Sequence, residues 1–286
     1  MKRFIIFSTV LIIFNSCVKN NPDPAWLEVT KWTLVSNSSL TGIEGELTHN
    51  FTEAWVYVDD EIIGVFDVPF KIPILKSGNV NIKIYPAIKN NGISATKKIY
   101  PFVESFEIND ELKINHTLTI NPITRYKGST KFWIGDFEDA STGIVTDPNS
   151  LTTMITANDP SILQWGNYGE VNLNTIDSNW IAYTDEHFNL PKGGNEVYLE
   201  IDYYNSNSLI TGVIGISSNS VNNNQNIQLN AQDIANLKWK KIYIDLKEIV
   251  SNSSDAEYFE MSFQALLDEG NSQGKIIIDN IKVVHF

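Results

Sequence analysis

The sequence predicts an all-β protein with two β-sandwich domains. Short alternating or continuously apolar runs recur along the 286 residues, as in WVYVDD at positions 55–60. Asn, Gly, Ser, Asp and Pro separate these runs, and these residue types favour turns. Helical periodicity is nearly absent. A series of short strands and turns of this kind is typical of β-sandwiches.

The N-terminus has the pattern of an export signal. Lys2 and Arg3 precede an apolar run at 4–14, which is too short to span a membrane. Cys17, the only cysteine, follows Ser16 directly. This resembles a bacterial lipoprotein signal, which implies removal of residues 1–16 and lipidation of Cys17. Several acyl chains anchor durably, at about 0.8 kcal/mol per buried methylene. An ordinary secretory signal with an incidental cysteine is the alternative.

Residues 17–27 are expected to form an extended tether that contains two prolines, VKNNPDP. The first domain is predicted over 28–127, with strands at 55–60, 70–74, 79–88, 97–108 and 112–120. Asn90-Asn91-Gly92 is a strong hairpin turn, because Asn and Gly accept positive φ. The segments YVD (57–59) and GNVNI (78–82) resemble the PEGA-type modules of surface proteins, which implies an Ig-like β-sandwich spacer.

The second domain is predicted over 129–286. GDFE at 135–138 stands near its start, WKKIYIDL at 239–246 in its middle and IDNI at 278–281 near its end. These three motifs, in this order, resemble those of jelly-roll carbohydrate-binding modules and galactose-binding-like domains. The resemblance implies a C-terminal jelly-roll β-sandwich. Its first and last strands should be neighbours, since a sandwich must protect its edges.

The resemblance also implies a structural Ca²⁺ that ties the first strand to the last. Ca²⁺ binds six to eight oxygen ligands, many of them from carboxylates. The candidate ligands are Asp136, Glu138, Asp139 and Asp279. The alternative is that these acids cap turns and face water.

Sugar binding requires exposed aromatic rings beside hydrogen-bonding groups. Strand 196–205 alternates, so that Val197, Leu199, Ile201 and Tyr203 should face the core and the intervening side chains a ligand. Aromatic residues in Asn-rich segments nearby add further candidates. The predicted ligand-binding residues are Trp165, Tyr168, Trp180, Tyr183, Tyr198, Glu200, Asp202 and Tyr204. Packing in the core is the alternative for each aromatic residue.

The charge of the chain disfavours nucleic acid as a partner. The formal net charge is −13, and residues 129–286 carry all of it, with 8 basic and 21 acidic residues. Such a surface repels phosphate backbones but tolerates cations and neutral sugars.

Catalysis is not expected, since the four histidines are scattered and no nucleophile-elbow, zinc or phosphate-loop motif is present. Glu200 and Asp202 are the one carboxylate pair considered for glycoside hydrolysis.

The sequence therefore predicts a lipoprotein of the outer membrane and cell envelope that binds a glycan without catalysis. The alternative is a structural or adaptor lipoprotein whose jelly roll binds another envelope protein. Glycan binding predicts a groove lined by at least two exposed aromatic residues. An adaptor predicts a flatter apolar patch, and an enzyme predicts two carboxylates across a cleft.

Overall fold

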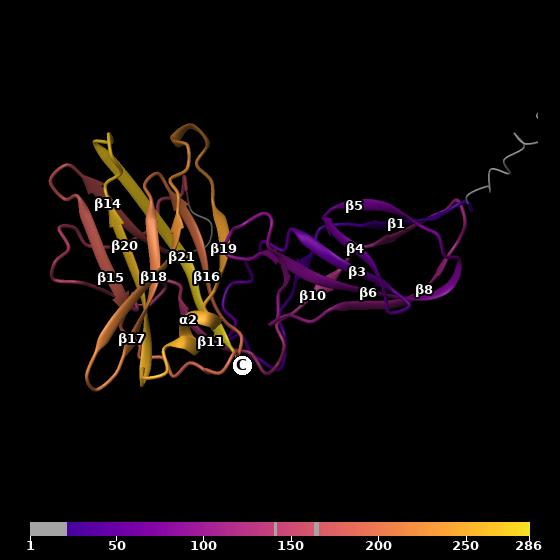
Figure 1. The fold of residues 1–286 in the computed structure, drawn as a ribbon. Helices are drawn as coiled ribbons and strands as arrows, with labels where there is room; N and C mark the ends of the chain where they lie inside the picture. Colours follow the sequence, from indigo (N-terminus) through magenta and orange to yellow (C-terminus); the bar gives the residue numbers. More distant parts are fainter. Residues whose placement is uncertain (1–21, 140–141, 163–165) are drawn as a thin grey trace, which may run out of the picture.

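A computed structural model describes residues 22–139, 142–162 and 166–286, and almost all of its regular structure is β (Figure 1). The predicted lipidation site Cys17 and the predicted ligand residue Trp165 lie outside these ranges. The all-β prediction is confirmed. Within the described ranges, no helix combines the length and the apolar character needed to cross a membrane.

The N-terminal domain contains three sheets. One has the order β5-β1-β9, the second is β4-β3-β6-β7 with β8 also paired to β6, and β10 and β2 form a short parallel pair. The strands are β1 (Ala25–Val29), β2 (Thr33–Leu34), β3 (Glu53–Val58), β4 (Glu61–Asp67), β5 (Phe70–Ile74), β6 (Gly78–Lys89), β7 (Lys97–Ile99), β8 (Phe106–Leu112), β9 (Thr117–Ile120) and β10 (Ile123–Thr124).

Alternation in the sequence matches burial in this domain. Val56 and Val58 of β3 are fully buried, whereas Trp55 and Tyr57 are half-buried on the opposite face. Asn91 and Gly92 have φ values of 56° and 71° in the turn between β6 and β7, as expected for this hairpin. The predicted strand at 97–108 is instead divided into β7 and β8. Pro101 lies between them and cannot donate a ladder hydrogen bond.

The C-terminal domain is a sandwich of two antiparallel sheets. One is β13-β14-β21-β16-β19 with β11 also paired to β21, and the other is β12-β15-β20-β17-β18. The strands are β11 (Lys131–Gly135), β12 (Ile144–Thr146), β13 (Ile155–Ala157), β14 (Tyr168–Asn174), β15 (Asn179–Thr184), β16 (Val197–Asn205), β17 (Leu209–Ile216), β18 (Val221–Leu229), β19 (Lys240–Asp245), β20 (Tyr258–Leu266) and β21 (Gln273–His285). The one described α-helix, α2, spans Lys247–Asn252.

The first and last strands of this sandwich are neighbours, as predicted. Strand β11 pairs with β21 in a register that places Gly135 opposite Ile281, so the GDFE and IDNI motifs meet. Successive strands mostly alternate between the two sheets, which is jelly-roll connectivity. The core between the sheets contains Val197, Leu199 and Ile201 of β16, on the face that the alternation predicted.

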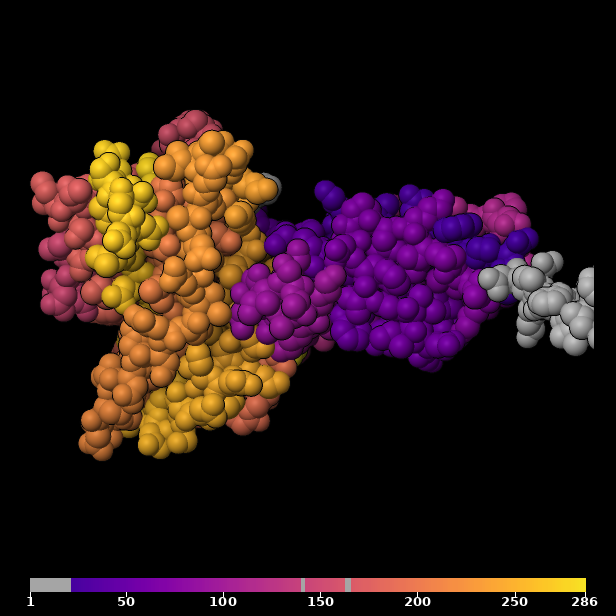
Figure 2. All heavy atoms as spheres, turned by 45° about the horizontal axis from the view of Figure 1, so that its top comes forward, coloured from indigo at the N-terminus to yellow at the C-terminus, as the bar shows by residue number. Residues whose placement is uncertain are grey.

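The N-terminal domain packs against the outer face of the β16-containing sheet (Figures 1 and 2). Tyr198, Tyr243 and Val284 of that sheet belong to the same buried cluster as the apolar residues of the N-terminal domain. Phe51 stacks on Tyr243 with ring centroids 5.8 Å apart. The backbone N–H of Asn91 also donates to the carbonyl oxygen of Tyr243, at 2.9 Å. The two domains therefore share a continuous apolar and hydrogen-bonded interface.

Candidate functional site

The strand face that the sequence assigned to the ligand is covered by the N-terminal domain. Tyr198, Glu200 and Asp202 of β16 are at most 1% exposed. The Tyr198 hydroxyl donates to Asn90 Oδ1 at 2.8 Å, and its ring meets Tyr100 edge-on. These three side chains are interdomain contacts, and their burial does not support the prediction that this strand face binds a ligand, although Asp202 also lines the groove described below. Alternation shows which residues share a face, but not what covers that face.

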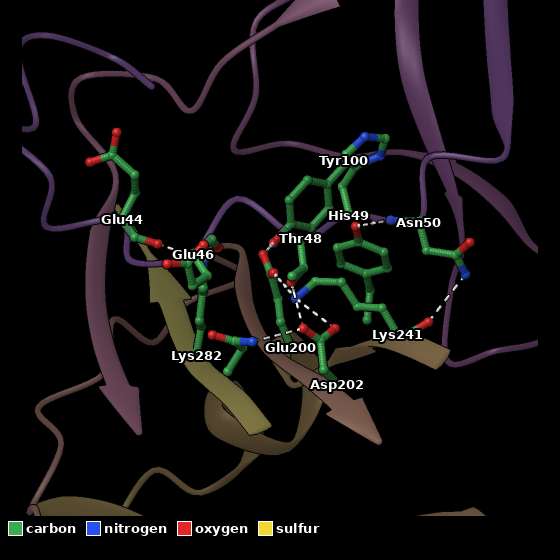
Figure 3. A network of polar contacts seen from close by, with 12 residues as sticks. Glu44, Glu46, Thr48, His49, Asn50, Tyr100, Glu200, Asp202, Lys241 and Lys282 are labelled. Atoms are coloured by element: carbon green, nitrogen blue, oxygen red, sulfur yellow. Dashed lines mark hydrogen bonds and ion pairs between the residues drawn. The ribbon is translucent and has the colours of Figure 1, made fainter. Parts of the chain in front are cut away.

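Glu200 is the centre of a buried polar network between the domains (Figure 3). It accepts hydrogen bonds from the hydroxyls of Tyr100 and Tyr126, both from the N-terminal domain. Lys241 of β19 lies 3.0 Å from its second oxygen. Burial alone would raise the pKa of Glu200, but Lys241 and then Lys282 outweigh it and lower this pKa. The carboxylate is therefore charged and fully paired.

Asp202 belongs to the same network. Its carboxylate accepts a 2.6 Å hydrogen bond from Thr48 and a 3.2 Å hydrogen bond from Asn280, and Lys241 lies 3.4 Å away. The Lys282 ammonium donates to the backbone carbonyls of Glu44 and Glu46, which brings the loop before Thr48 onto β21. Two carboxylates and two ammonium groups are buried here together. Glu200 and Asp202 do not face each other across a cleft, as a hydrolytic pair would.

A groove of about 810 Å³ opens beside this network, where the N-terminal domain meets the edge strand β19. A volume of this size suits a small ligand or a few sugar units. The segment Leu47–Thr52 and the hairpin at Lys89 and Gly92 form one side. Residues around Trp239 form the other side, together with Tyr203 of β16.

Trp239 is held in a fixed orientation at this groove. Its indole N–H donates to the carbonyl oxygen of Ile162 at 2.6 Å. Its ring also packs near Tyr204 and Tyr168, with centroids 6.0 and 6.3 Å away. Trp239 stays half-buried, so part of the indole remains open to the groove. A ring fixed before binding loses little conformational entropy when a ligand stacks on it.

Polar groups surround the indole. His49 and Asn50 line the groove, and Asn50 is tied to β19 through the carbonyl oxygen of Lys241, at 3.1 Å. Burial, followed by the nearby charge of Lys241, lowers the pKa of His49, so its imidazole is neutral at pH 7. Burial raises the pKa of Tyr203, whose phenol stays protonated. His49, Asn50 and Tyr203 thus add neutral donors and acceptors to the aromatic surface of the groove.

The other predicted ligand residues are dispersed. Trp180 is fully buried and stacks on Phe263, and Tyr168 is fully buried beneath Trp239, so neither prediction of ligand contact is supported by its exposure. Tyr183 is half-buried on β15 of the other sheet. Tyr204 is half-buried beside Trp239 and supports the indole.

Three of the four predicted calcium ligands line one pocket of about 550 Å³. They are Asp136, Glu138 and Asp279, whereas Asp139 is exposed and does not line the pocket. Glu138 accepts hydrogen bonds from the backbone and side chain of Asn167. Within the described ranges, no group of three His, Cys, Asp or Glu residues is placed to hold a metal ion. The acids therefore fit a calcium site only in part, and Ca²⁺ stays a prediction.

Asp279 should make the stability of the protein depend on pH. Burial, followed by repulsion from Asp202, Asp136 and Glu138, raises its pKa from 3.8 to about 8. Folding then takes up a proton between these two pH values. The free energy of unfolding should fall as the pH rises through this window, by up to about 1.4 kcal/mol per pH unit. Urea denaturation at pH 5, 6, 7 and 8 measures this slope.

Asp279→Asn is the matched variant, because it keeps the shape of the side chain and cannot titrate. Its stability should depend less steeply on pH than that of the wild type, and parallel pH profiles would contradict the role of Asp279.

Thermal melting of both proteins with Ca²⁺ and with chelator tests whether a calcium ion is bound. A calcium site predicts that chelator lowers the melting temperature of the wild type by several degrees and that of the variant far less.

Comparisons with known proteins identify similar structures. No protein-family model matches the chain, and no curated protein matches it. A carbohydrate-binding module of the β-sandwich superfamily aligns over 80% of this chain and 83% of its own, with 14% identity and a TM-score of 0.38. The CBM22-2 xylan-binding domain of Paenibacillus barcinonensis Xyn10C aligns over 54% of this chain and 99% of its own, with 12% identity and a TM-score of 0.37.

The enzymatically active domain of tailspike protein 4 from bacteriophage CBA120 is also similar over 52% of this chain, with 14% identity and a TM-score of 0.38. This chain covers only 20% of that protein. The structural neighbours are thus mostly carbohydrate-binding modules, with one enzyme domain among them. Because every one of these scores is below 0.5, the function proposed next rests on the geometry of the groove.

Proposed function

We propose that the protein binds a glycan, without catalysis, in the groove between its two domains. The observation that carries this proposal is Trp239, a half-buried indole fixed by a hydrogen bond and two aromatic neighbours at a groove of about 810 Å³. Tyr203 adds a second partly exposed ring, and Asn50 and His49 add polar partners. Sugars need this combination, since a ring stacks on their apolar faces while polar groups take their hydroxyls.

The alternative of an adaptor has less support. A protein-binding surface would be a broad, flat apolar patch, whereas this groove is concave and contains His49, Asn50 and four lysines. Hydrolysis also has little support, because the carboxylates of Glu200 and Asp202 are buried and paired with Lys241. Both observations favour binding of a polar ligand without bond cleavage.

A glycan array tests the proposal. The chain from Pro22 onward, which contains every described strand, is applied to immobilised polysaccharides and oligosaccharides. At least one glycan should be retained and should stay chemically unchanged on prolonged incubation. If no glycan is retained and pull-downs recover an envelope protein, the protein is an adaptor and the proposal is wrong. If the bound glycan becomes shorter, the protein is an enzyme and the proposal of binding without catalysis is wrong.

We further propose that Cys17 carries a lipid that anchors the protein to the outer membrane. Strand β1 begins at Ala25, at the end of the N-terminal domain remote from the C-terminal sandwich (Figure 1). Ala25 is eight positions after Cys17, a reach of about 28 Å when extended. An anchor at this end would hold the groove away from the lipid surface.

Cys17→Ala should release the full-length protein from the membrane fraction, because the thiol is the group that receives the lipid. Fractionation of cells that express either form measures the shift, and mass spectrometry of the N-terminal peptide detects the lipid directly. Ser16→Ala is the control, because it leaves the thiol of Cys17 in place. This variant should stay in the membrane fraction. An unchanged distribution of Cys17→Ala would contradict the anchor.

A further inference from the structure

We infer that the groove selects an acidic glycan, one that carries carboxylate or sulfate groups. This inference rests on the proposed function and specifies its ligand class. Four lysines line the groove, namely Lys89, Lys238, Lys240 and Lys241, whereas Asp202 is the one acidic residue in the lining. Asp202 is already neutralised by Lys241. The groove therefore has an excess of positive charge.

This excess contrasts with the composition of the C-terminal domain. Residues 129–286 contain 8 basic and 21 acidic residues, and three of those basic residues fall within four positions, at Lys238, Lys240 and Lys241. A cleft lined by one sign of charge focuses the electric field and raises the local concentration of ligands of the opposite sign. Solubility alone would not require this clustering of scarce lysines around a tryptophan.

The lysines differ in their availability. Lys241 is buried and forms ion pairs with Glu200 and Asp202, so it belongs to the interface. Lys89 lies 3.7 Å from the buried carboxylate of Glu53 and is partly compensated. Lys238 and Lys240 are exposed, and no hydrogen bond or ion pair ties either ammonium group to another described residue. These two ammonium groups are free to bind an anion.

The free lysines and the indole together point to a charged sugar. An ammonium group forms its strongest hydrogen bonds with anionic oxygens, and Lys presents three donors that adapt to different geometries. Trp239 in the same groove provides a plane for a sugar ring. A polyanion without rings would use the lysines but not the indole. The remaining surface of the domain, with its excess of acids, would repel long polyanions outside the groove.

A paired glycan panel tests the inference. Polygalacturonate, alginate, chondroitin sulfate and heparin are each compared with their esterified, carboxyl-reduced or desulfated forms, and polyglutamate serves as a polyanion without sugar rings. The chain from Pro22 onward should bind at least one acidic glycan about tenfold more tightly than its neutralised form. Lys238→Gln/Lys240→Gln should remove this preference, with about a tenfold loss of affinity. Raising the salt concentration should lower the affinity of the wild type for the acidic glycan more than that of the variant.

Lys31→Gln/Lys131→Gln is the charge-matched control, because both lysines are exposed and neither lines the groove. It should bind like the wild type. If a neutralised glycan binds as tightly as its acidic form, or only neutral glycans bind, the inference is overturned and the proposed function stands. If no glycan binds, both are overturned. If polyglutamate binds as tightly as the acidic glycan, or if both double variants lose the same affinity, the lysines act through non-specific charge. Either result would overturn the inference.

Discussion

Lys241→Met is expected to lower the free energy of unfolding by about 3–5 kcal/mol, the typical cost of leaving a buried charge without its partner. The Lys241 side chain is 4% exposed, and its ammonium group lies 3.0 Å from Glu200 and 3.4 Å from Asp202. Methionine fills a similar volume but carries no charge, so the negative charges of the two buried carboxylates lose part of their compensation. Urea denaturation at pH 7, followed by tryptophan fluorescence, measures the loss.

Lys113→Met is the control for this variant. Lys113 pairs with Glu111 at 3.1 Å, but both side chains are more than half exposed. An ion pair in solvent contributes about 0–1 kcal/mol, so this variant should stay close to the wild type. If the two substitutions cost the same, the buried network would not be what holds the two domains in this arrangement.

Trp239→Ala is expected to weaken glycan binding about 30-fold or more, which corresponds to about 2 kcal/mol for loss of an aromatic hot spot. Its indole is held in place by Ile162, Tyr204 and Tyr168 before any ligand arrives. Alanine removes the stacking surface. Isothermal titration with the tightest glycan from the array measures the change, and circular dichroism checks that the fold is retained.

Trp26→Ala provides the matched comparison. Trp26 is also half-buried, but it lies on β1 of the N-terminal domain, and Lys71 lies over its ring at 5.8 Å. Its loss should leave the affinity for the glycan within about twofold of the wild type, since it does not line the groove. Equal affinity of wild type and Trp239→Ala would remove the main support for the groove.

The strands of the fold were largely predictable because most of them alternate in sequence. Strand β16 is the best case, since Val197, Leu199 and Ile201 lie in the core as alternation predicted, although Tyr203 is only partly buried and also lines the groove. Strand β18 is hard to recognise in the sequence, because VNNNQNIQL has exposed amides at positions where a buried strand has apolar residues. Strand β14 is hard to recognise as well, because Tyr168-Gly169 continues an Asn- and Gly-rich segment that is typical of a loop.

The site was less predictable, because its residues come from distant segments. Glu200 and Asp202 have the pattern of a solvated strand face, and only the fold brings Thr48, Tyr100 and Lys241 to them. Trp239 was noted as part of a strand motif but was not proposed to bind a ligand. A signal for it was present in the sequence, since KWKK at 238–241 places lysines beside a tryptophan in an otherwise acidic domain.

A crystal structure of the protein with an oligosaccharide bound tests the central claim most directly. A sugar ring is expected to stack on Trp239 in the groove between the domains, with Asn50 or His49 within hydrogen-bonding distance. A sugar bound on the outer face of the β12-β15-β20-β17-β18 sheet, with the groove holding only water, would contradict it.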